Sequence, residues 1–141
     1  MAIKLDQLRT GASLPEMQKM ISQADINLYA QASRDFNPIH IDEEFARRTP
    51  AGGTIAHGML ILAYISEVMT RAFERNWLTA GGLNVRFKAP ARPGDVIRVQ
   101  VKVEKIVPEG ESGLVICGVT CLNQTGDIVV NGEARVRLNT K

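Results

Sequence analysis

The sequence has 141 residues, 45% of them hydrophobic and 23% charged, a composition that is typical of folded globular proteins and excludes a disordered chain. This length predicts one domain over residues 1–141. A formal net charge of +2 with scattered basic residues does not favour a nucleic-acid partner. Because there is no apolar run of about 20 residues and no signal-like start, we expect a cytoplasmic protein that does not enter a membrane.

Two short helices are predicted after a first strand. Residues 15–21 alternate loosely between apolar and polar side chains and predict the strand. Ser22 is suited to cap a helix over residues 23–32, whose apolar residues recur mostly at helical spacing. Asp42 is suited to cap a second helix over residues 43–48.

A bend and a long helix are predicted next. Pro38 has no amide hydrogen and restrains Asn37 to extended geometry, so the first helix should end before it and residues 35–40 should form a shaped loop. The strongest helical pattern runs over residues 55–77, where apolar residues leave almost no polar face before Arg71. We therefore expect this helix to be buried nearly all round.

The rest of the chain predicts an antiparallel sheet. Four runs bounded by turn residues are typical of strands, namely residues 80–89, 95–107, 113–123 and 127–138. Cys117 and Cys121 share a face of one run at a separation of about 13 Å, which is too far for a disulfide, so two buried thiols are expected. One long apolar helix with long strands predicts an α+β fold, in which a curved antiparallel sheet wraps around the helix.

The residues suited to catalysis lie around the predicted bend. Asp35 and His40 stand on either side of Asn37-Pro38, so the bend can aim a carboxylate and an imidazole at one small volume. A helix that begins near His57-Gly58 would present unpaired amides and the positive end of its dipole nearby. These features predict proton transfer to or from a substrate that develops negative charge.

Three segments of the chain form a wider pattern. They are residues 35–40 with the motif D-x-N-P-x-H, residues 55–60 with His57-Gly58-Met59, and residues 84–87 followed by Pro93-Gly94-Asp95. Together they resemble the MaoC-like dehydratase family, which includes (R)-specific enoyl-CoA hydratases, over nearly the whole chain. The resemblance implies a single hotdog fold and a homodimer paired edge to edge. It also implies reversible addition of water to a trans-2-enoyl thioester of coenzyme A or acyl carrier protein, giving an (R)-3-hydroxyacyl thioester.

The resemblance implies roles for individual residues as well. Asp35 and His40 match the catalytic pair that holds and activates the attacking water. Gly58 matches the residue whose backbone amide binds the thioester oxygen, where the missing Cβ would let that oxygen approach closely. The reaction requires no metal and no redox cofactor.

Other positions are expected to support the site. Asn37 and Ser66 match supporting residues of the family, and His57 is interpreted as a structural residue whose ring bonds nearby backbone at the helix start. The sequence departs from the family at Arg34, where many members have glycine or an acidic residue, and this changes the charge beside Asp35. Four basic residues could meet coenzyme A phosphates or an acidic carrier protein, although a solvated sheet face is the interpretation we favour for them: Arg86, Lys88, Arg92 and Arg98.

Two alternatives stay open from the sequence alone. A hotdog thioesterase would use an acid on or near the central helix, and Glu67 is the only acid in the first turns of that helix. A non-catalytic acyl-binding partner subunit would need a second, active chain, although the retained Asp35 and His40 favour an active hydratase. The sequence does not determine the acyl chain length or the carrier.

Overall fold

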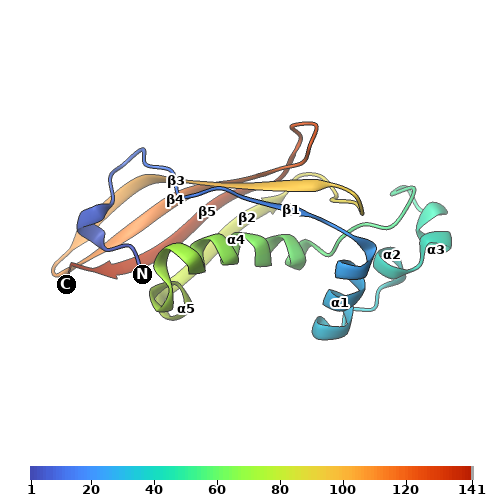
Figure 1. Cartoon of the computed structure of the whole chain (residues 1–141), viewed down its shortest axis with the longest axis horizontal. Coiled ribbons are helices and arrows are strands. Elements are labelled where there is room, and N and C mark those ends of the chain that lie inside the picture. The colour runs from blue at the N-terminus through green and yellow to red at the C-terminus, as the bar shows by residue number, and fades with distance from the viewer. Residues whose placement is uncertain (141) are drawn as a thin grey trace.

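An antiparallel sheet and one long helix make up most of the computed structural model, which describes residues 1–140 (Figure 1). The strands are β1 (Met17–Met20), β2 (Gly81–Phe87), β3 (Val96–Glu109), β4 (Ser112–Leu122) and β5 (Ile128–Asn139). Their order in the sheet is β1-β3-β4-β5-β2, and all neighbours are antiparallel. The predicted α+β fold is confirmed.

The sheet has one buried face because apolar side chains alternate along its strands. In β4, every second residue from Gly113 to Cys121 is buried. The predicted turn after β3 is displaced, because Pro108 pairs with Gly113 inside the sheet and the chain reverses at Gly110 and Glu111. Proline is tolerated there because β1 pairs only with the beginning of β3, which leaves an open edge beside Pro108.

The long helix α4 (Gly58–Phe73) lies along the buried face of the sheet (Figure 1). It is shorter than the predicted span of residues 55–77, because Glu74 adopts a positive φ of 47° and a separate helix, α5 (Arg75–Ala80), follows. The expectation that it is buried nearly all round is wrong, since the sheet covers only one side and Met59 is 58% exposed. Its buried residues form a helical stripe: Leu60, Ile61, Tyr64, Ile65, Val68, Met69, Ala72 and Phe73.

Three further helices gather beyond the N-terminal end of α4 (Figure 1). They are α1 (Gln23–Ser33), α2 (Pro38–Ile41) and α3 (Glu43–Arg47), while a short 3-10 helix, η1 (Leu5–Gln7), lies at the opposite end of the sheet. The predicted caps are confirmed, because Ser22 accepts a hydrogen bond from the amide of Asp25 and Asp42 accepts one from that of Phe45. None of the helices within residues 1–140 has the length and hydropathy to cross a membrane.

The two cysteines lie in the buried core of β4. Both are free thiols with no exposed surface, as predicted. Burial raises the pKa of Cys117 to about 12, with a smaller contribution from the negative charge of Glu104, and burial alone raises the pKa of Cys121 to about 12. These thiols stay protonated and unreactive at neutral pH.

Candidate active site

The bend that holds Asp35 begins where α1 ends. Arg34 takes the left-handed conformation with φ 64° and ψ 20°, which turns the chain out of the helix. This geometry favours glycine, one of the residues that the resemblance led us to expect in place of Arg34. Beyond it, the Asp35 amide donates to the Ser33 hydroxyl at 3.2 Å, and one Asp35 carboxylate oxygen accepts from the Asn37 amide at 3.2 Å.

His40 is held on a single helical turn rather than in the predicted loop. The side chain of Asn37 accepts a hydrogen bond from the amide of Ile39, and Pro38 at the first helical position has a φ that suits a helix. The prediction that residues 35–40 form a loop throughout is therefore wrong from Pro38 onward. Asn37 supports the site by capping the turn that presents His40.

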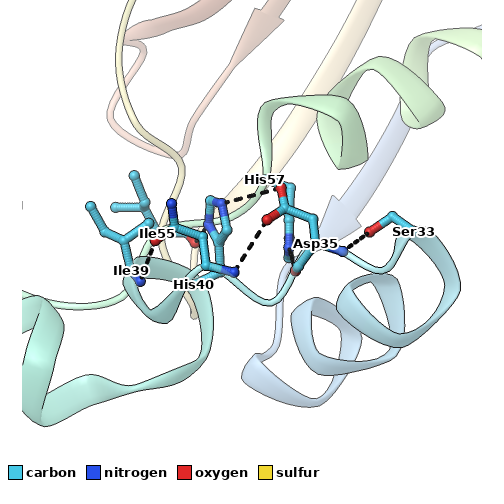
Figure 2. A network of polar contacts seen from close by, with 7 residues as sticks. Ser33, Asp35, Ile39, His40, Ile55 and His57 are labelled. Atoms are coloured by element: carbon cyan, nitrogen blue, oxygen red, sulfur yellow. Dashed lines mark hydrogen bonds and ion pairs between the residues drawn. The ribbon is translucent and has the colours of Figure 1, made fainter.

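Asp35 and His40 face each other across a short gap (Figure 2). Nδ1 of His40 lies 2.8 Å from the carbonyl oxygen of Ile55, and because a carbonyl only accepts, Nδ1 carries the hydrogen. Nε2 of the neutral ring is then an acceptor, and it lies 3.9 Å from Oδ2 of Asp35. The side chain of Asp35 is 52% exposed and that of His40 is 12% exposed, so solvent can reach the gap.

The separation of these two acceptors suits one water molecule. At 3.9 Å, Nε2 and Oδ2 are too far apart for a direct hydrogen bond. Two bonds of about 2.8 Å from a single water would span the gap with an angle of about 90° at its oxygen, close to the angle between the two O–H bonds of water. The structure thus brings the predicted pair together in a geometry that can polarise a water.

A network of polar groups, of which Thr54 is buried, holds the backbone of His40 from behind. Nε2 of Gln23 donates to the carbonyl of His40 at 2.8 Å, and the hydroxyl of Thr54 donates to Oε1 of Gln23 at 2.8 Å. The amide of Thr54 donates to the carboxylate of Glu43 at 3.0 Å, and this bond, together with the Thr54 side chain and Arg47, holds the pKa of Glu43 below its ordinary value. Sequence reasoning missed Gln23 and Thr54.

His57 lies in the same cluster and touches both members of the pair. Its side chain is buried, and its ring stacks on that of His40 with 3.8 Å between centroids and 26° between planes. Its Nε2 lies 3.0 Å from the carbonyl oxygen of Asp35 (Figure 2). The ring of Tyr29 packs against it with centroids 4.8 Å apart. We expected this ring to bond nearby backbone, and its contact with the carbonyl of Asp35 is a bond of that kind.

Gly58 opens α4 beside a cleft of about 560 Å³. His40 also lines this cleft, so its side chain and the start of α4 border the same space. A Cβ on Gly58 would lie 2.7 Å from Cε1 of Phe87, which means that glycine is required for this close packing. The remaining wall is mostly apolar: Ile55, Ala56, Met59, Ile61, Phe87, Lys88, Ala89, Pro90, Ala91 and Val129.

Two predicted or alternative residues of α4 lie away from this cleft. The hydroxyl of Ser66 accepts a hydrogen bond from Nε1 of Trp77 at 2.8 Å, about 12 Å along the helix from Gly58. Glu67, one residue farther, forms ion pairs with Lys19 at 3.0 Å and with Arg71 at 3.1 Å. The structure does not place either side chain with Asp35 and His40.

A larger hollow of about 720 Å³ lies over the sheet. Its lining is polar and of mixed charge, including Arg86, Gln100, Lys102, Glu104 and Glu133. Lys88, by contrast, is a basic residue at the cleft beside Gly58. The smaller cleft is the better candidate, because there a mostly apolar wall meets the imidazole of His40 and the start of a long helix.

The cluster also has the donor atoms of a metal site. One ligand-type atom from each of Asp35, His40 and His57 lies within 4.8 Å of the others. An ion there would occupy the Nε2 lone pair of His40 and a carboxylate oxygen of Asp35, the same two acceptors that a bridging water would use. The two histidines already use Nδ1 of His40 and Nε2 of His57 on backbone carbonyls. Nε2 of His40 and Nδ1 of His57 are therefore the ring nitrogens left to bind an ion or a water.

The chain is similar in sequence and in fold to known hydratases and dehydratases. Residues 9–123 match the family described as MaoC like domain. The chain is 36% identical over 126 residues to the 3-hydroxybutyryl-CoA dehydratase of Methylorubrum extorquens, covering 89% of this chain and 78% of that protein. It is 36% identical over 131 residues to the (R)-specific enoyl-CoA hydratase of Rhodospirillum rubrum, covering 93% of this chain and 88% of that protein. The R-hydratase of Pseudomonas aeruginosa in its unliganded form superposes with a TM-score of 0.84 at 29% identity, covering 99% of this chain and 88% of that one.

Proposed function

This chain belongs to the MaoC-like domain family, and we propose that it is a hydro-lyase that adds water reversibly to a trans-2-enoyl thioester, giving an (R)-3-hydroxyacyl thioester. The observation that supports this most directly is the 3.9 Å gap between Oδ2 of Asp35 and Nε2 of His40, at the edge of a cleft that Gly58 also lines. The two side chains can accept both hydrogens of one water, which turns a lone pair of its oxygen toward the cleft.

The chemistry follows from these positions. As the water oxygen bonds C3 of the enoyl group, Asp35 and His40 take up one of its protons, and a proton from the pair is delivered to C2. One O–H bond of the water and the C2=C3 π bond of the enoyl group break while a C–O and a C–H bond form, so the elements of water are added and nothing is oxidised. Proton transfer by groups placed in this way typically contributes about 10² to 10⁴ in rate.

Gly58 is proposed to stabilise the charge that develops on the thioester oxygen. The first N–H groups of α4 have no partner inside the helix, and the helix dipole is positive at this end. A single such donor is worth about 3 to 4 kcal/mol in the transition state of well-studied enzymes. Because Gly58 lines the cleft, a substrate oxygen bound there can approach its amide.

The cleft supports a proposal for the substrate. Its apolar wall at Met59, Ile61 and Phe87 suits an acyl chain, and the ammonium of Lys88 suits the phosphates of coenzyme A or an acidic carrier protein. We propose an acyl thioester as the substrate and neither a metal nor a redox cofactor, since proton transfer and an amide donor meet every need of the reaction.

We also propose that the chain works as a homodimer. Strand β2 is an edge of the sheet, and its residues are mostly exposed. Phe87 at the end of β2 is 56% exposed and Met59 on the open side of α4 is 58% exposed. An exposed edge beside exposed apolar side chains favours pairing with a second copy. A monomer in analytical ultracentrifugation would overturn this proposal.

The catalytic pair can be tested with the purified chain and crotonyl-CoA. Asp35→Asn and His40→Ala should each lower the rate of enoyl absorbance loss by about 10² or more. Asp42→Asn is the matched control, because asparagine also caps a helix and Asp42 caps α3 rather than belonging to the cluster. The control should keep the parental rate.

Other results would overturn the proposal. Parental turnover by either Asp35→Asn or His40→Ala would exclude the pair as catalytic. Release of free thiol without hydration would identify a thioesterase, the alternative that the sequence left open. Activity that appears only with a second protein would identify a partner subunit.

A further inference from the structure

His57 contacts the backbone carbonyl of Asp35 and the ring of His40 while lying out of solvent, and the proposed reaction does not use it. From its contacts we infer that His57 is a positioning residue, which holds Asp35 and His40 at the separation where they share one water. This inference rests on the proposed function and deepens it. It is drawn from three observations: a hydrogen bond to the Asp35 backbone, a ring stack on His40 and an unpartnered ring nitrogen.

The first link fixes Asp35. Its other polar contacts are local, to Ser33 and Asn37, so they shape the bend without attaching it to the rest of the fold. The bond of 3.0 Å between Nε2 of His57 and the carbonyl of Asp35 joins the bend to the start of α4. Because the carbonyl can only accept, Nε2 of His57 donates. The position of Asp35 relative to Gly58 therefore depends on this bond.

The second link fixes the ring of His40. One edge of that ring is held by the Ile55 carbonyl, which leaves the ring free to swing about this contact. The stacked ring of His57, 3.8 Å away at 26°, closes one face and prevents the swing. Tyr29 packs against His57 with centroids 4.8 Å apart, so the supporting ring is itself held in place. The direction of Nε2 of His40 toward Asp35 is thereby set.

The third observation separates positioning from simple packing. The residue is 2% exposed, and within the part of the chain that the structure describes Nδ1 of His57 has no hydrogen-bond partner. A buried acceptor without a partner destabilises a fold. An apolar ring would fill the same space without that cost, so the stability of the core does not explain a histidine here. The donor at Nε2 does.

Three substitutions separate the two links. His57→Gln keeps an amide N–H at about the position of Nε2 but removes the ring, whereas His57→Phe keeps a flat ring but removes the donor. His57→Leu removes both. Val103→Ala is the matched control for lost stability, because Val103 is buried on β3 and does not belong to the cluster.

The kinetic readout is kcat and KM for crotonyl-CoA, corrected for the folded fraction measured by circular dichroism. We expect kcat to fall about 10-fold in His57→Gln and in His57→Phe and about 10²-fold in His57→Leu, as expected for misplaced catalytic groups. KM should stay close to parental, because Met59, Phe87 and Lys88 still line the cleft. Val103→Ala should melt earlier and keep its kcat.

A structural readout tests the inference without relying on the reaction. In a crystal structure of His57→Leu, the distance from Oδ2 of Asp35 to Nε2 of His40 should exceed the parental 3.9 Å or differ between copies. The inference would be overturned by an unchanged distance or by parental kcat in all three variants. It would also be overturned if KM rose by the same factor as kcat fell. If the parental chain does not hydrate crotonyl-CoA, the proposed function fails, and the crystallographic distance still decides the role of His57.

Discussion

Substitution of Gly58 by alanine tests the oxyanion role through a contact that the structure specifies. A Cβ at this position would lie 2.7 Å from Cε1 and 2.9 Å from Cζ of Phe87. Ordinary carbon contacts are about 3.5 Å or longer, so the ring must move by about 1 Å. Since Phe87 is 56% exposed, its ring can do so and the protein should fold. We propose that the new methyl group would also crowd the amide that the thioester oxygen approaches.

We therefore expect Gly58→Ala to lower kcat/KM for crotonyl-CoA by about 10²-fold, because a shift of about 1 Å in a reacting group costs this much. The melting temperature, followed by circular dichroism, should change little. Activity could fall because the methyl group displaces the Phe87 ring or because it blocks the amide. Phe87→Ala removes that ring, so the double variant separates these two causes. If the methyl group itself blocks the oxygen, the loss from Gly58→Ala persists in the Phe87→Ala background. Parental activity of Gly58→Ala, or full recovery in the double variant, would refute the oxyanion assignment.

Three further predictions concern the support of the site, the core and the chemistry. Gln23→Leu should lower kcat about 10-fold by releasing the His40 backbone, and an unchanged kcat in steady-state assays would contradict this. Because the folded thiols of Cys117 and Cys121 have pKa values of about 12 and unfolded ones about 9, the unfolded chain loses protons first and stability falls as pH rises from 9 to 12. Between pH 9 and pH 10 the two thiols should remove about 2 kcal/mol, so urea unfolding of the Cys117→Ala/Cys121→Ala variant should show a smaller loss than the parent over this interval. Dialysis against EDTA should leave hydration unchanged, and activity that is lost and then restored by a metal ion would show that the cluster holds an ion.

Local sequence signals determined much of the fold. Ser22 and Asp42 were identifiable as caps because a capping side chain bonds an amide two or three residues ahead, and both caps are observed. The strands could also be located from local signals, because apolar and polar side chains alternate along a strand and a few consecutive residues show this period. The D-x-N-P-x-H motif likewise indicated Asp35 and His40, because their separation is set within one bend and one helical turn.

Contacts between distant segments decided the ends of the long helix. The pattern extended to Ile55, but the amides of Ile55 and Ala56 bind the carbonyls of Ile39 and Ala91 and His57 has a non-helical ψ of 135°, so the helix begins at Gly58. At the other end the chain turns at Glu74 and brings the buried Trp77 back against Ser66 on α4. Hydrophobic periodicity continues through both places, and only the path of the chain interrupts the helix.

The sequence by itself determined which residues could perform the chemistry. Asp35 and His40 lie within one bend and Gly58 lies at one helix start, so local sequence signals were enough to identify them. Only the tertiary structure decided what supports them. Gln23 reaches the carbonyl of His40 across 17 residues, and His57 reaches that of Asp35 across 22. No local pattern predicts such contacts, because they depend on how separate elements pack, and packing sets the distance at which two side chains can hold one water.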